Sequence, residues 1–329
     1  MHLRILSAED VRKALPMATA IEAMKQAFGQ YSAGRAIVPL RVRLEGASEN
    51  SAALFMPAVL RDTGEMAVKV VTVYPTNLAL GLPTIHALVL ALDAQSGRPL
   101  ALLEGASLTA IRTGAASGAA TDLLARNDAR TLAIFGSGAQ ARTQLEAVCT
   151  VRSIERAWIF SLDLPGANAM VEQMAGKGPV PDSLVIAATA GQAVAEADVI
   201  CTATTSSTPV FDGADLRPGT HINAIGAFTP TMQEVDSTSV RRAVVFVDAR
   251  EAAWAEAGDL IIPMQRGEIS ADKVKGELGE VVNKTILGRE SPAQITLFKS
   301  VGLAVQDAVA AGRALAEAQR TGIGSTISL

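Results

Sequence analysis

Short apolar runs recur through the middle of the chain, each of four to six residues. They are Leu132–Phe135, Arg156–Phe160, Ser183–Ala187, Asp198–Ala203, His221–Ile225 and Ala243–Val247. Their length and apolarity are typical of strands buried in a parallel sheet. Helix-forming segments lie between them, at Ala139–Val148 and around Gln192–Glu196. Strands that alternate with helices predict an α/β fold with a Rossmann-type, doubly wound parallel sheet.

The N-terminal region predicts a different sheet. Its expected strands, separated by turns at Gly46, Asp62-Thr63-Gly64 and Ser96-Gly97, are Ile37–Leu44, Ala52–Met56, Ala67–Val73 and Ile85–Leu92. Such a meander favours an antiparallel or mixed sheet. A helix at about Met17–Ser32 precedes it, and Leu297–Gln319 reads as a long alanine-rich helix.

The length of 329 residues exceeds what one hydrophobic core usually supports. Because a terminal helix often packs back on the first domain, we expect the parallel sheet to be inserted into a discontinuous α+β domain. The expected boundaries are 1–112 plus 300–329 for the discontinuous domain and 113–299 for the inserted one.

A glycine-rich turn lies between the first apolar run and the helix after it, in the segment TLAIFGSGAQARTQ, residues 131–144. Gly136 and Gly138 allow backbone to approach a pyrophosphate, whose charge the helix amino end favours. We therefore expect NAD(H) or NADP(H) to bind there, with contacts at Gly136, Gly138, Ala139 and Gln140. The alternative is a turn that only packs helix on strand.

The choice between the two cofactors depends on Asp163, about 25 residues after Gly138. An acid at this distance bonds ribose hydroxyls and repels a 2′-phosphate, which favours NAD(H). However, Leu164-Pro165 leaves the end of the preceding strand ambiguous, and Asp163 then reads as a turn residue.

Composition narrows the possible functions. Hydrophobic residues make up 49% and charged residues 19% of the chain, and the net charge is -4. This charge offers no basic surface for nucleic acid or an anionic membrane. The three histidines and two cysteines have no metal-ligand spacing, and Cys149 and Cys201 in apolar segments suit free thiols in a reducing compartment. Without a signal peptide or long apolar span, we expect a cytoplasmic protein that acts on a small molecule.

A segment rich in small residues, Leu108–Ala125, joins the two regions. Gly114 and Gly118 suit a helix that packs closely on the neighbouring sheet. Arg112 just before them would lie where the two domains meet, a usual place for small-molecule sites. The alternative for Arg112 is a solvated surface group.

The chain resembles the ornithine cyclodeaminase and mu-crystallin family over nearly its whole length. The matching blocks are Pro39-Leu40-Arg41, Met56-Pro57-Ala58, Ala67-Val68-Lys69, Gly81-Leu82-Pro83-Thr84, Leu108-Thr109 with Arg112-Thr113-Gly114-Ala115, GSGAQARTQ and Ser300-Val301-Gly302. The resemblance implies a homodimer whose first domain carries substrate groups and subunit contacts, while the inserted Rossmann domain binds NAD or NADP.

The resemblance also implies roles for individual residues. Arg41 and Arg112 match arginines that bind a substrate carboxylate, as a guanidinium fork can. Lys69 matches the family's lysine at the substrate, and Thr84 a residue that contacts substrate or cofactor. Further cofactor contacts are implied at Arg112, Thr204, Ile225, Gly226 and Gly302. Lys69 could instead extend its amine from an apolar strand to solvent. The other readings are an ordinary strand residue for Thr84, a strand end for Thr204 and helix packing for Gly302.

One position departs from the cyclodeaminases. They carry an aspartate in the loop Ile225–Pro230, at the position that we align with Phe228, and phenylalanine cannot accept a proton. GAFTPTMQEVD instead resembles members that reduce cyclic ketimines such as Δ1-pyrroline-2-carboxylate and Δ1-piperideine-2-carboxylate. Phe228 is then an expected substrate contact, and its alternative is a loop residue wedged against the core.

These matches imply reduction of a cyclic ketimine carboxylate to L-proline or L-pipecolate by NAD(P)H. Lys69, Arg112 and His86 are the candidate catalytic residues, with His86 in a proton relay or, alternatively, a core histidine. An alanine-type amino-acid dehydrogenase remains an alternative. Ornithine cyclodeamination would need a substitute acid such as Glu234 or Asp236. A non-catalytic NAD(P)- or ligand-binding crystallin-like protein is the alternative from another class.

Overall fold

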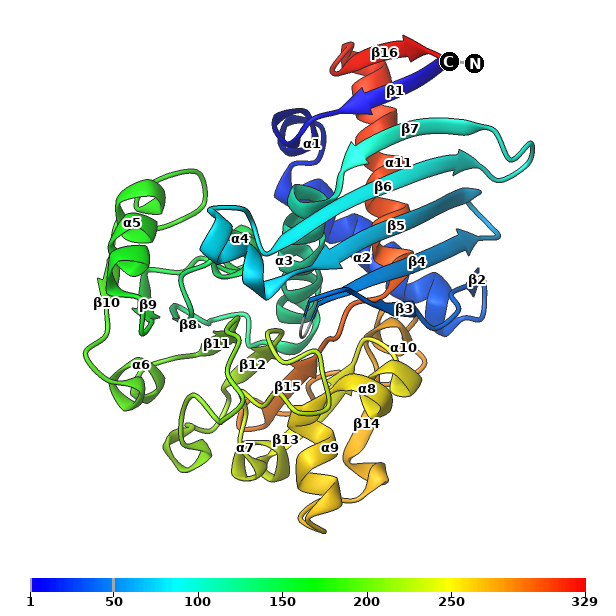
Figure 1. Cartoon of the computed structure of the whole chain (residues 1–329). Coiled ribbons are helices and arrows are strands. Elements are labelled where there is room, and N and C mark those ends of the chain that lie inside the picture. The colour runs from blue at the N-terminus through cyan, green and yellow to red at the C-terminus, as the bar shows by residue number, and fades with distance from the viewer. Residues whose placement is uncertain (1, 49–50) are drawn as a thin grey trace. The chain divides into compact units, whose positions relative to one another are not determined.

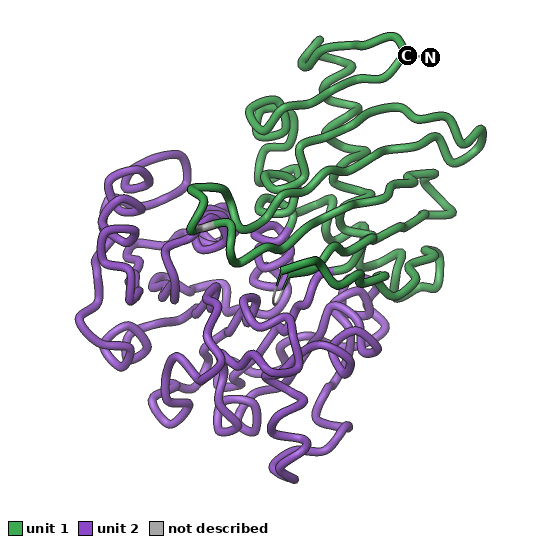
Figure 2. Tube along the Cα trace, viewed as in Figure 1, with its two compact units in different colours: residues 1–112, 303–329 green, residues 113–302 purple. Residues whose placement is uncertain are grey.

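The computed structural model describes residues 2–48 and 51–329. The chain is divided into two compact units (Figure 2). Unit 1 consists of Met1–Arg112 together with Leu303–Leu329, and unit 2 of Thr113–Gly302. Unit 2 is thus inserted between two segments of unit 1.

Unit 2 is built on a parallel sheet with strand order β10-β9-β8-β11-β12-β15-β13-β14 (Figure 1). Its strands are β8 (Thr131–Phe135), β9 (Arg156–Phe160), β10 (Leu184–Ile186), β11 (Val199–Thr202), β12 (His221–Ala224), β13 (Ala243–Val247), β14 (Val274–Glu277) and β15 (Ile295–Lys299). Each of the six apolar runs in the middle of the chain overlaps one of these strands. The strand order reverses between β8 and β11, which confirms the doubly wound α/β fold.

Helices link the strands of unit 2. They are α4 (Ala139–Val151), α5 (Leu164–Met174), α6 (Ala190–Ala195), α7 (Ser237–Arg242), α8 (Arg250–Glu256), α9 (Gly258–Gln265) and α10 (Leu278–Val282), with short turns η2 (Gly213–Asp215) and η3 (Ala271–Lys273). Leu145 of α4 and Met170 of α5 join Ile134 of β8 and Ile159 of β9 in a buried cluster. Burial of such side chains provides the main favourable free energy for packing these layers.

Helix α3 (Gly105–Leu124) contains the small residues that predicted close packing. A Cβ atom on Gly114 would lie 2.5 Å from the carbonyl oxygen of Thr143 in α4. No side chain fits at that distance, so glycine permits the two helices to approach. Gly114 thus permits close packing, as expected, but its close neighbour is helix α4 and not the sheet.

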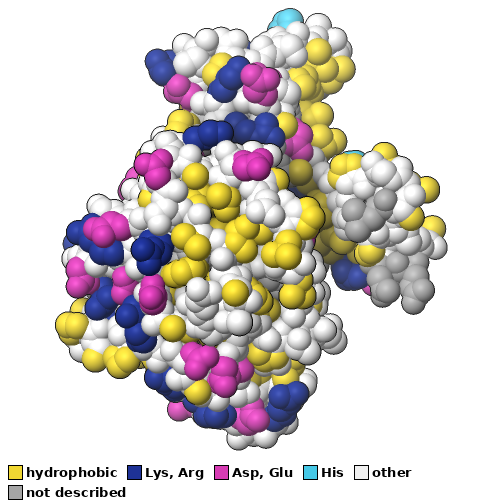
Figure 3. All heavy atoms as spheres, turned by 90° about the vertical axis from the view of Figure 1, so that its left-hand side faces the viewer, with side chains coloured by type: hydrophobic (Ala, Val, Ile, Leu, Met, Phe, Trp, Pro, Cys, Tyr) yellow, Lys and Arg dark blue, Asp and Glu magenta, His cyan; other side chains and the backbone are white. Residues whose placement is uncertain are grey.

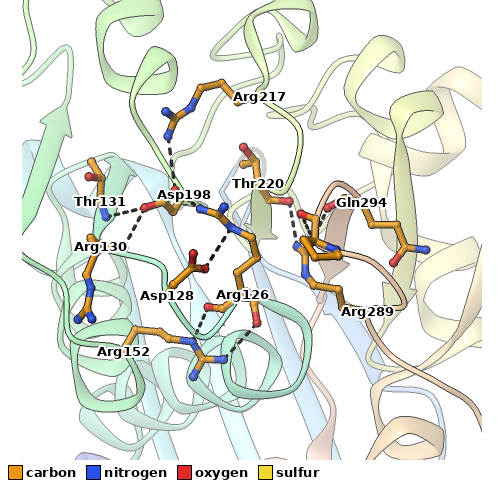
Figure 4. Close-up of polar contacts among 12 residues, drawn as sticks. Arg126, Asp128, Arg130, Thr131, Arg152, Asp198, Arg217, Thr220, Arg289 and Gln294 are labelled. Carbon is orange, nitrogen blue, oxygen red and sulfur yellow. Dashed lines mark hydrogen bonds and ion pairs between the residues drawn. The ribbon is translucent and has the colours of Figure 1, made fainter.

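The carboxyl end of α3 is held by arginines of unit 2 (Figure 4). Arg152 donates hydrogen bonds to the carbonyl oxygens of Thr121, Asp122, Ala125 and Arg126, and Arg289 donates to that of Leu124. The last carbonyls of a helix have no intrahelical partners, and arginines satisfy them while complementing the negative end of the helix dipole.

The segment 297–299 is a strand, not the start of the C-terminal helix as expected. β15 lies between β12 and β13, and its five residues are all buried. Ile295, Thr296 and Phe298 are β-branched or aromatic residues, which favour strands. Helix α11 (Ala304–Thr321) begins only after Gly302, whose φ is 82°.

Unit 1 contains a mixed sheet with strand order β16-β1-β7-β6-β5-β4-β2, and β3 also pairs with β4. Its strands are β1 (His2–Leu6), β2 (Ala36–Ile37), β3 (Val42–Glu45), β4 (Ala52–Leu60), β5 (Glu65–Val73), β6 (Ile85–Asp93), β7 (Pro99–Glu104) and β16 (Ser325–Ser328). The single strand expected at Ile37–Leu44 is two short strands. Pro39 lies between them, and proline cannot donate to a sheet ladder.

Helices cover one face of the unit 1 sheet (Figure 1). They are α1 (Ala8–Ala14), α2 (Met17–Ser32), which has the predicted bounds, and α11, which contacts α2 and strands β4, β5 and β6. The short helix η1 (Pro75–Leu80) connects β5 to β6. Side chains on β4 alternate between buried and half-buried, so one sheet face forms the core and the other faces outward.

Charges of both signs are mixed with apolar groups on the face drawn in Figure 3.

Cys149 and Cys201 are free and buried, as expected, and burial raises the pKa of each thiol to about 12. Within residues 2–48 and 51–329, no helix has the length and apolarity needed to cross a membrane.

Candidate active site

A cavity of about 580 Å³ lies in unit 2 at the carboxyl ends of β8, β9 and β11. Ligands of open α/β sheets bind at this edge, where the strand order reverses. Four of the residues expected to bind cofactor line the cavity: Gly136, Gly138, Asp163 and Thr204. The structure therefore brings together residues that are up to 68 positions apart in the sequence.

The glycine turn shapes one wall of this cavity. Gly136 has φ 110°, and a Cβ atom there would lie 2.6 Å from the carbonyl oxygen of Ala203. Gly138 precedes α4, and a Cβ atom on it would meet open space. Among the described residues no side chain caps the amino end of α4, so its N–H groups remain available to an anion. These features fit a dinucleotide pyrophosphate.

Asp163 lines the cavity and also caps a helix. Its Oδ1 accepts a hydrogen bond from the Gly166 N–H at 3.1 Å, at the amino end of α5. β9 ends at Phe160, so Asp163 lies in the loop where a ribose-binding acid is expected. Among the described residues that line the cavity, none is a lysine or arginine.

Unit 1 contains a buried cluster of charged side chains. Lys69 Nζ lies 2.8 Å from Asp307 Oδ2, and Arg112 Nε lies 3.1 Å from Asp307 Oδ1. Arg112 Nη1 also donates to Gln306 Oε1 at 3.1 Å. All four residues are at least 95% buried. Lys69 therefore does not extend to solvent, and Arg112 is not a surface group in this structure.

Three elements position this cluster. Lys69 is on β5, Arg112 on α3, and Asp307 on α11. Lys69 lies on the sheet face that α11 covers, and its neighbours on β4 and β6 are Met56 and Val89. A lysine between apolar strand neighbours requires a nearby acid, and the helix supplies it.

Burial, together with the charges in the cluster, sets the pKa of Lys69. Burial lowers the pKa of Lys69 to about 8; Asp307 opposes this shift, while Arg112 and Arg41 add to it. Arg41, which directly precedes β3, is thus close enough to act electrostatically on Lys69. Burial alone would raise the pKa of Asp307, but Arg112 and Lys69 hold it below its ordinary value.

Asp307 was not predicted as a site residue, although the sequence contained a signal. Helix α11 has an apolar stripe that buries Ala304, Ala308, Ala311 and Leu315. Asp307 falls within this stripe at helical spacing. An acid in the buried stripe of an amphipathic helix indicates a buried cationic partner.

Comparisons with known proteins agree with this geometry. The model of the ornithine cyclodeaminase/mu-crystallin family matches residues 1–321. The chain belongs to this family. A Delta(1)-pyrroline-2-carboxylate reductase of Bacillus cereus is 43% identical over 324 residues, which cover 98% of this chain and 99% of that protein.

Two solved structures of named family enzymes are also similar over the whole chain. A Delta(1)-pyrroline-2-carboxylate reductase of Thermococcus litoralis, in complex with NADH and L-proline, matches at TM-score 0.94 and 42% identity, covering 99% of this chain and 100% of its own. An archaeal alanine dehydrogenase dimer with bound NAD matches at TM-score 0.92 and 35% identity, covering 100% of both chains.

The remaining family positions are distributed over both units. Thr84 is half-buried and directly precedes β6. His86 pairs with Thr72, and Lys69 pairs with Val89, so His86 and Lys69 lie on opposite faces of the unit 1 sheet. The structure does not bring His86 to the buried cluster.

The loop after β12 contains Ile225, Gly226 and Phe228. Ile225 is buried, whereas Phe228 is 38% exposed, so Phe228 is not wedged into the core. Gly302 ends unit 2, and its N–H donates to the buried Asp248.

The two acids considered as substitutes for the family's aspartate have structural partners. Glu234 is fully buried and accepts hydrogen bonds from five donors on residues 202, 204, 226 and 227. Burial raises the pKa of Glu234; Asp259 adds to this shift and Lys299 opposes it. Asp236 caps α7. Neither arrangement supports a role in cyclodeamination.

Proposed function

We propose that this protein reduces a cyclic ketimine carboxylate, Δ1-pyrroline-2-carboxylate or Δ1-piperideine-2-carboxylate, to L-proline or L-pipecolate with NAD(P)H. The observation that carries the proposal is the buried cluster of Lys69, Arg112 and Asp307 in a chain that also has a dinucleotide-type cavity. The named activities of the Bacillus and Thermococcus relatives support this choice of substrate.

The cationic groups of unit 1 suit a monocarboxylate. Arg41, Lys69 and Arg112 carry three positive charges, and Asp307 carries one negative charge. Arg41 and Arg112 would bind the carboxylate through charge-assisted hydrogen bonds. Asp307 would hold Lys69 and Arg112 in place before substrate arrives, which reduces the reorganisation needed on binding.

The cofactor supplies the hydride that C2 of the imine accepts. The imine must carry a proton on nitrogen to be a good acceptor, and a protonated lysine can supply or retain that proton. With its pKa lowered to about 8, Lys69 is mostly protonated at neutral pH but releases its proton more readily than an ordinary lysine. Lys69 is therefore the proposed proton donor, and Thr84 a proposed contact of the ring.

NAD(H) is the proposed preferred cofactor. Asp163 lies at the cavity where a ribose would bind, and the lining residues among those described include no cation for a 2′-phosphate. The two similar structures contain NADH and NAD. The proposed cofactor contacts are Gly136, Gly138, Ala139 and Gln140 of the glycine turn, together with Arg112, Thr204, Ile225, Gly226 and Gly302.

An assay of NADH and NADPH oxidation tests the proposal. We expect rapid turnover with the five- or six-membered cyclic ketimine, and slow turnover with pyruvate plus ammonia. Ornithine should release no ammonia, because the loop position aligned with the cyclodeaminase aspartate is Phe228. Faster turnover of pyruvate plus ammonia than of either ketimine would instead make the protein an alanine dehydrogenase, the activity of the archaeal structure.

Binding without turnover is the remaining alternative. Tight NADH binding with no oxidation by either ketimine would favour a crystallin-like binding protein. Arg41→Ala and Lys69→Ala variants then complete the test: near-normal kcat/KM in both would exclude the proposed carboxylate site.

A further inference from the structure

We infer that Glu234 is a positioning residue for the cofactor: its carboxylate holds the loops that follow β11 and β12 in the arrangement that binds the dinucleotide. The inference rests on the proposed function and adds a residue to it. Glu234 has no exposed surface. It therefore acts through its neighbours and not by contact with cofactor or substrate.

Each carboxylate oxygen of Glu234 binds different backbone. Oε1 accepts from the N–H of Thr204 at 2.6 Å and from its hydroxyl at 2.7 Å. Oε2 accepts from the N–H groups of Gly226 at 2.6 Å and Ala227 at 3.0 Å, and from the Thr202 hydroxyl at 2.9 Å. One side chain thus connects the carboxyl ends of two adjacent parallel strands.

The loop after β11 belongs to the cavity that contains the glycine turn. Residues 203–206 line this cavity, and Ala203 lies next to Gly136, since a Cβ atom on Gly136 would be 2.6 Å from the Ala203 carbonyl oxygen. The loops also lie very close to each other, since a Cβ atom on Gly226 would lie 2.3 Å from the Thr204 carbonyl oxygen and 2.4 Å from Glu234 Oε1. A change in the position of Glu234 would therefore move both.

A second buried carboxylate holds Glu234 itself. Asp259 Oδ1 accepts from the backbone N–H groups of Glu234 at 2.7 Å and Val235 at 2.9 Å. Asp259 Oδ2 forms an ion pair with Lys299 Nζ at 2.8 Å, and both side chains are fully buried. Lys299 ends β15, so the arrangement extends over the carboxyl ends of three adjacent strands, β11, β12 and β15.

The site requires an acceptor at both oxygens of residue 234. Of the five donors, three are backbone N–H groups that can only donate, one at Oε1 and two at Oε2. A glutamine has the same shape but replaces one oxygen by a donor. The Thr204 hydroxyl can turn to accept from that amide, whereas the Thr204 N–H cannot. Glu234→Gln should therefore displace the Thr204 loop from its observed position.

The test compares Glu234→Gln with Asp236→Asn. Asp236 is two residues away and also binds backbone N–H groups, of Gly213 and Ser239, but it binds none of the residues 202, 204, 226 and 227 that Glu234 binds. NADH affinity is measured by its fluorescence, together with kcat and both KM values. For Glu234→Gln we expect the Kd and KM of NADH to rise about 10- to 100-fold, as for a lost bond to a charged group. The ketimine KM should change little, because the carboxylate-binding residues are in unit 1.

A merely structural effect would look different. Partial unfolding lowers kcat through the active fraction and leaves the NADH KM unchanged, and Asp236→Asn should show at most this pattern. Glu234→Asp keeps the charge but shortens the side chain, so an intermediate loss of NADH affinity is expected. If Glu234→Gln does not fold, the NADH affinity of Glu234→Asp tests the positioning role instead.

Unchanged NADH affinity in a folded Glu234→Gln, or in Glu234→Asp when Glu234→Gln does not fold, would overturn the inference. Equal loss of NADH affinity in Asp236→Asn would also overturn it. Failure of the proposed function gives a separate result, because the unmodified protein would then not bind NADH or would bind it without reducing a ketimine.

Discussion

Asp307 is the residue on which the buried cations of unit 1 depend. It contacts both Lys69 and Arg112, and its side chain is only 1% exposed. Burial of a lysine costs free energy unless an opposite charge compensates it. The carboxylate of Asp307 therefore allows the two cations to be buried, and it holds them where a substrate anion could bind.

We predict that Asp307→Asn destabilises the protein by roughly 3 kcal/mol, since removal of one partner leaves buried charge without compensation. Urea unfolding followed by circular dichroism measures the change. Glu317→Gln is the control, because Glu317 forms its ion pair with Arg320 at an exposed site of the same helix and should have a much smaller effect. Equal effects of the two substitutions would contradict the role given to Asp307.

The lowered pKa of Lys69 predicts how carboxylate binding depends on pH. Below about pH 8 the amine is charged and attracts the carboxylate; above it the charge is lost. The Ki of cyclopentanecarboxylate, an analogue without a titrating nitrogen, should rise about tenfold as pH increases through this value. Inhibition that is constant from pH 6.5 to about 9.5 would contradict a carboxylate contact by Lys69.

At the residue scale, the sequence pointed to the basic residues Lys69 and Arg112 but not to the acid that pairs with them. Lys69 is conspicuous because it interrupts an apolar strand, and Arg112 because small residues follow it. Asp307 and Glu234 are ordinary acids on a helix and in a loop, and their importance arises from contacts 238 and 30 positions away in sequence. The position of Asp307 in the apolar stripe of α11 indicates a buried cationic partner, but no local pattern identifies that partner, and none marks Glu234.

At the scale of elements, α3 and α4 depend on a glycine for their contact. Gly114→Ala should destabilise the protein by about 1–3 kcal/mol, because the new methyl group would lie 2.5 Å from the Thr143 carbonyl oxygen and force the helices apart. Gly191→Ala is the matched control on a helix of the same unit, where the nearest atom would be at 3.5 Å, an ordinary contact. If both variants had the melting temperature of the original protein, this would contradict the close contact between α3 and α4 at Gly114.

Most elements of the central sheet could be predicted, since buried parallel strands are short, apolar and separated by helices. The errors have physical reasons. The expected C-terminal helix included the end of β15 because alanines follow it closely, although three of the five residues of β15 are β-branched or aromatic. β1, β7, β14 and β16 were not predicted; β14 and β16 are edge strands with mixed polar residues, and tertiary pairing determines such strands more than local pattern.

For the whole molecule, the outer face of the unit 1 sheet is the most informative surface. Val42, Phe55, Val70 and Leu88 are successive partners across β3, β4, β5 and β6, so they form an apolar row on the face opposite α11. Val42 is 55% and Leu88 49% exposed. An apolar surface that continues across strands indicates a protein interface. Since a similar archaeal structure is a dimer, we propose that two copies of this chain associate through this face.

If two copies pair through this face, Leu88→Lys should convert the dimer to a monomer, because two-fold symmetry places the new charge twice in an apolar interface. Light scattering coupled to size-exclusion chromatography measures the mass directly. Leu287→Lys is the control, since Leu287 is 69% exposed in unit 2, far along the chain from this sheet, and the protein should remain a dimer. If the Leu88→Lys variant remained a dimer while the Leu287→Lys variant became a monomer, the interface would be on unit 2. A monomeric unmodified protein would show that the apolar face has no second copy as its partner.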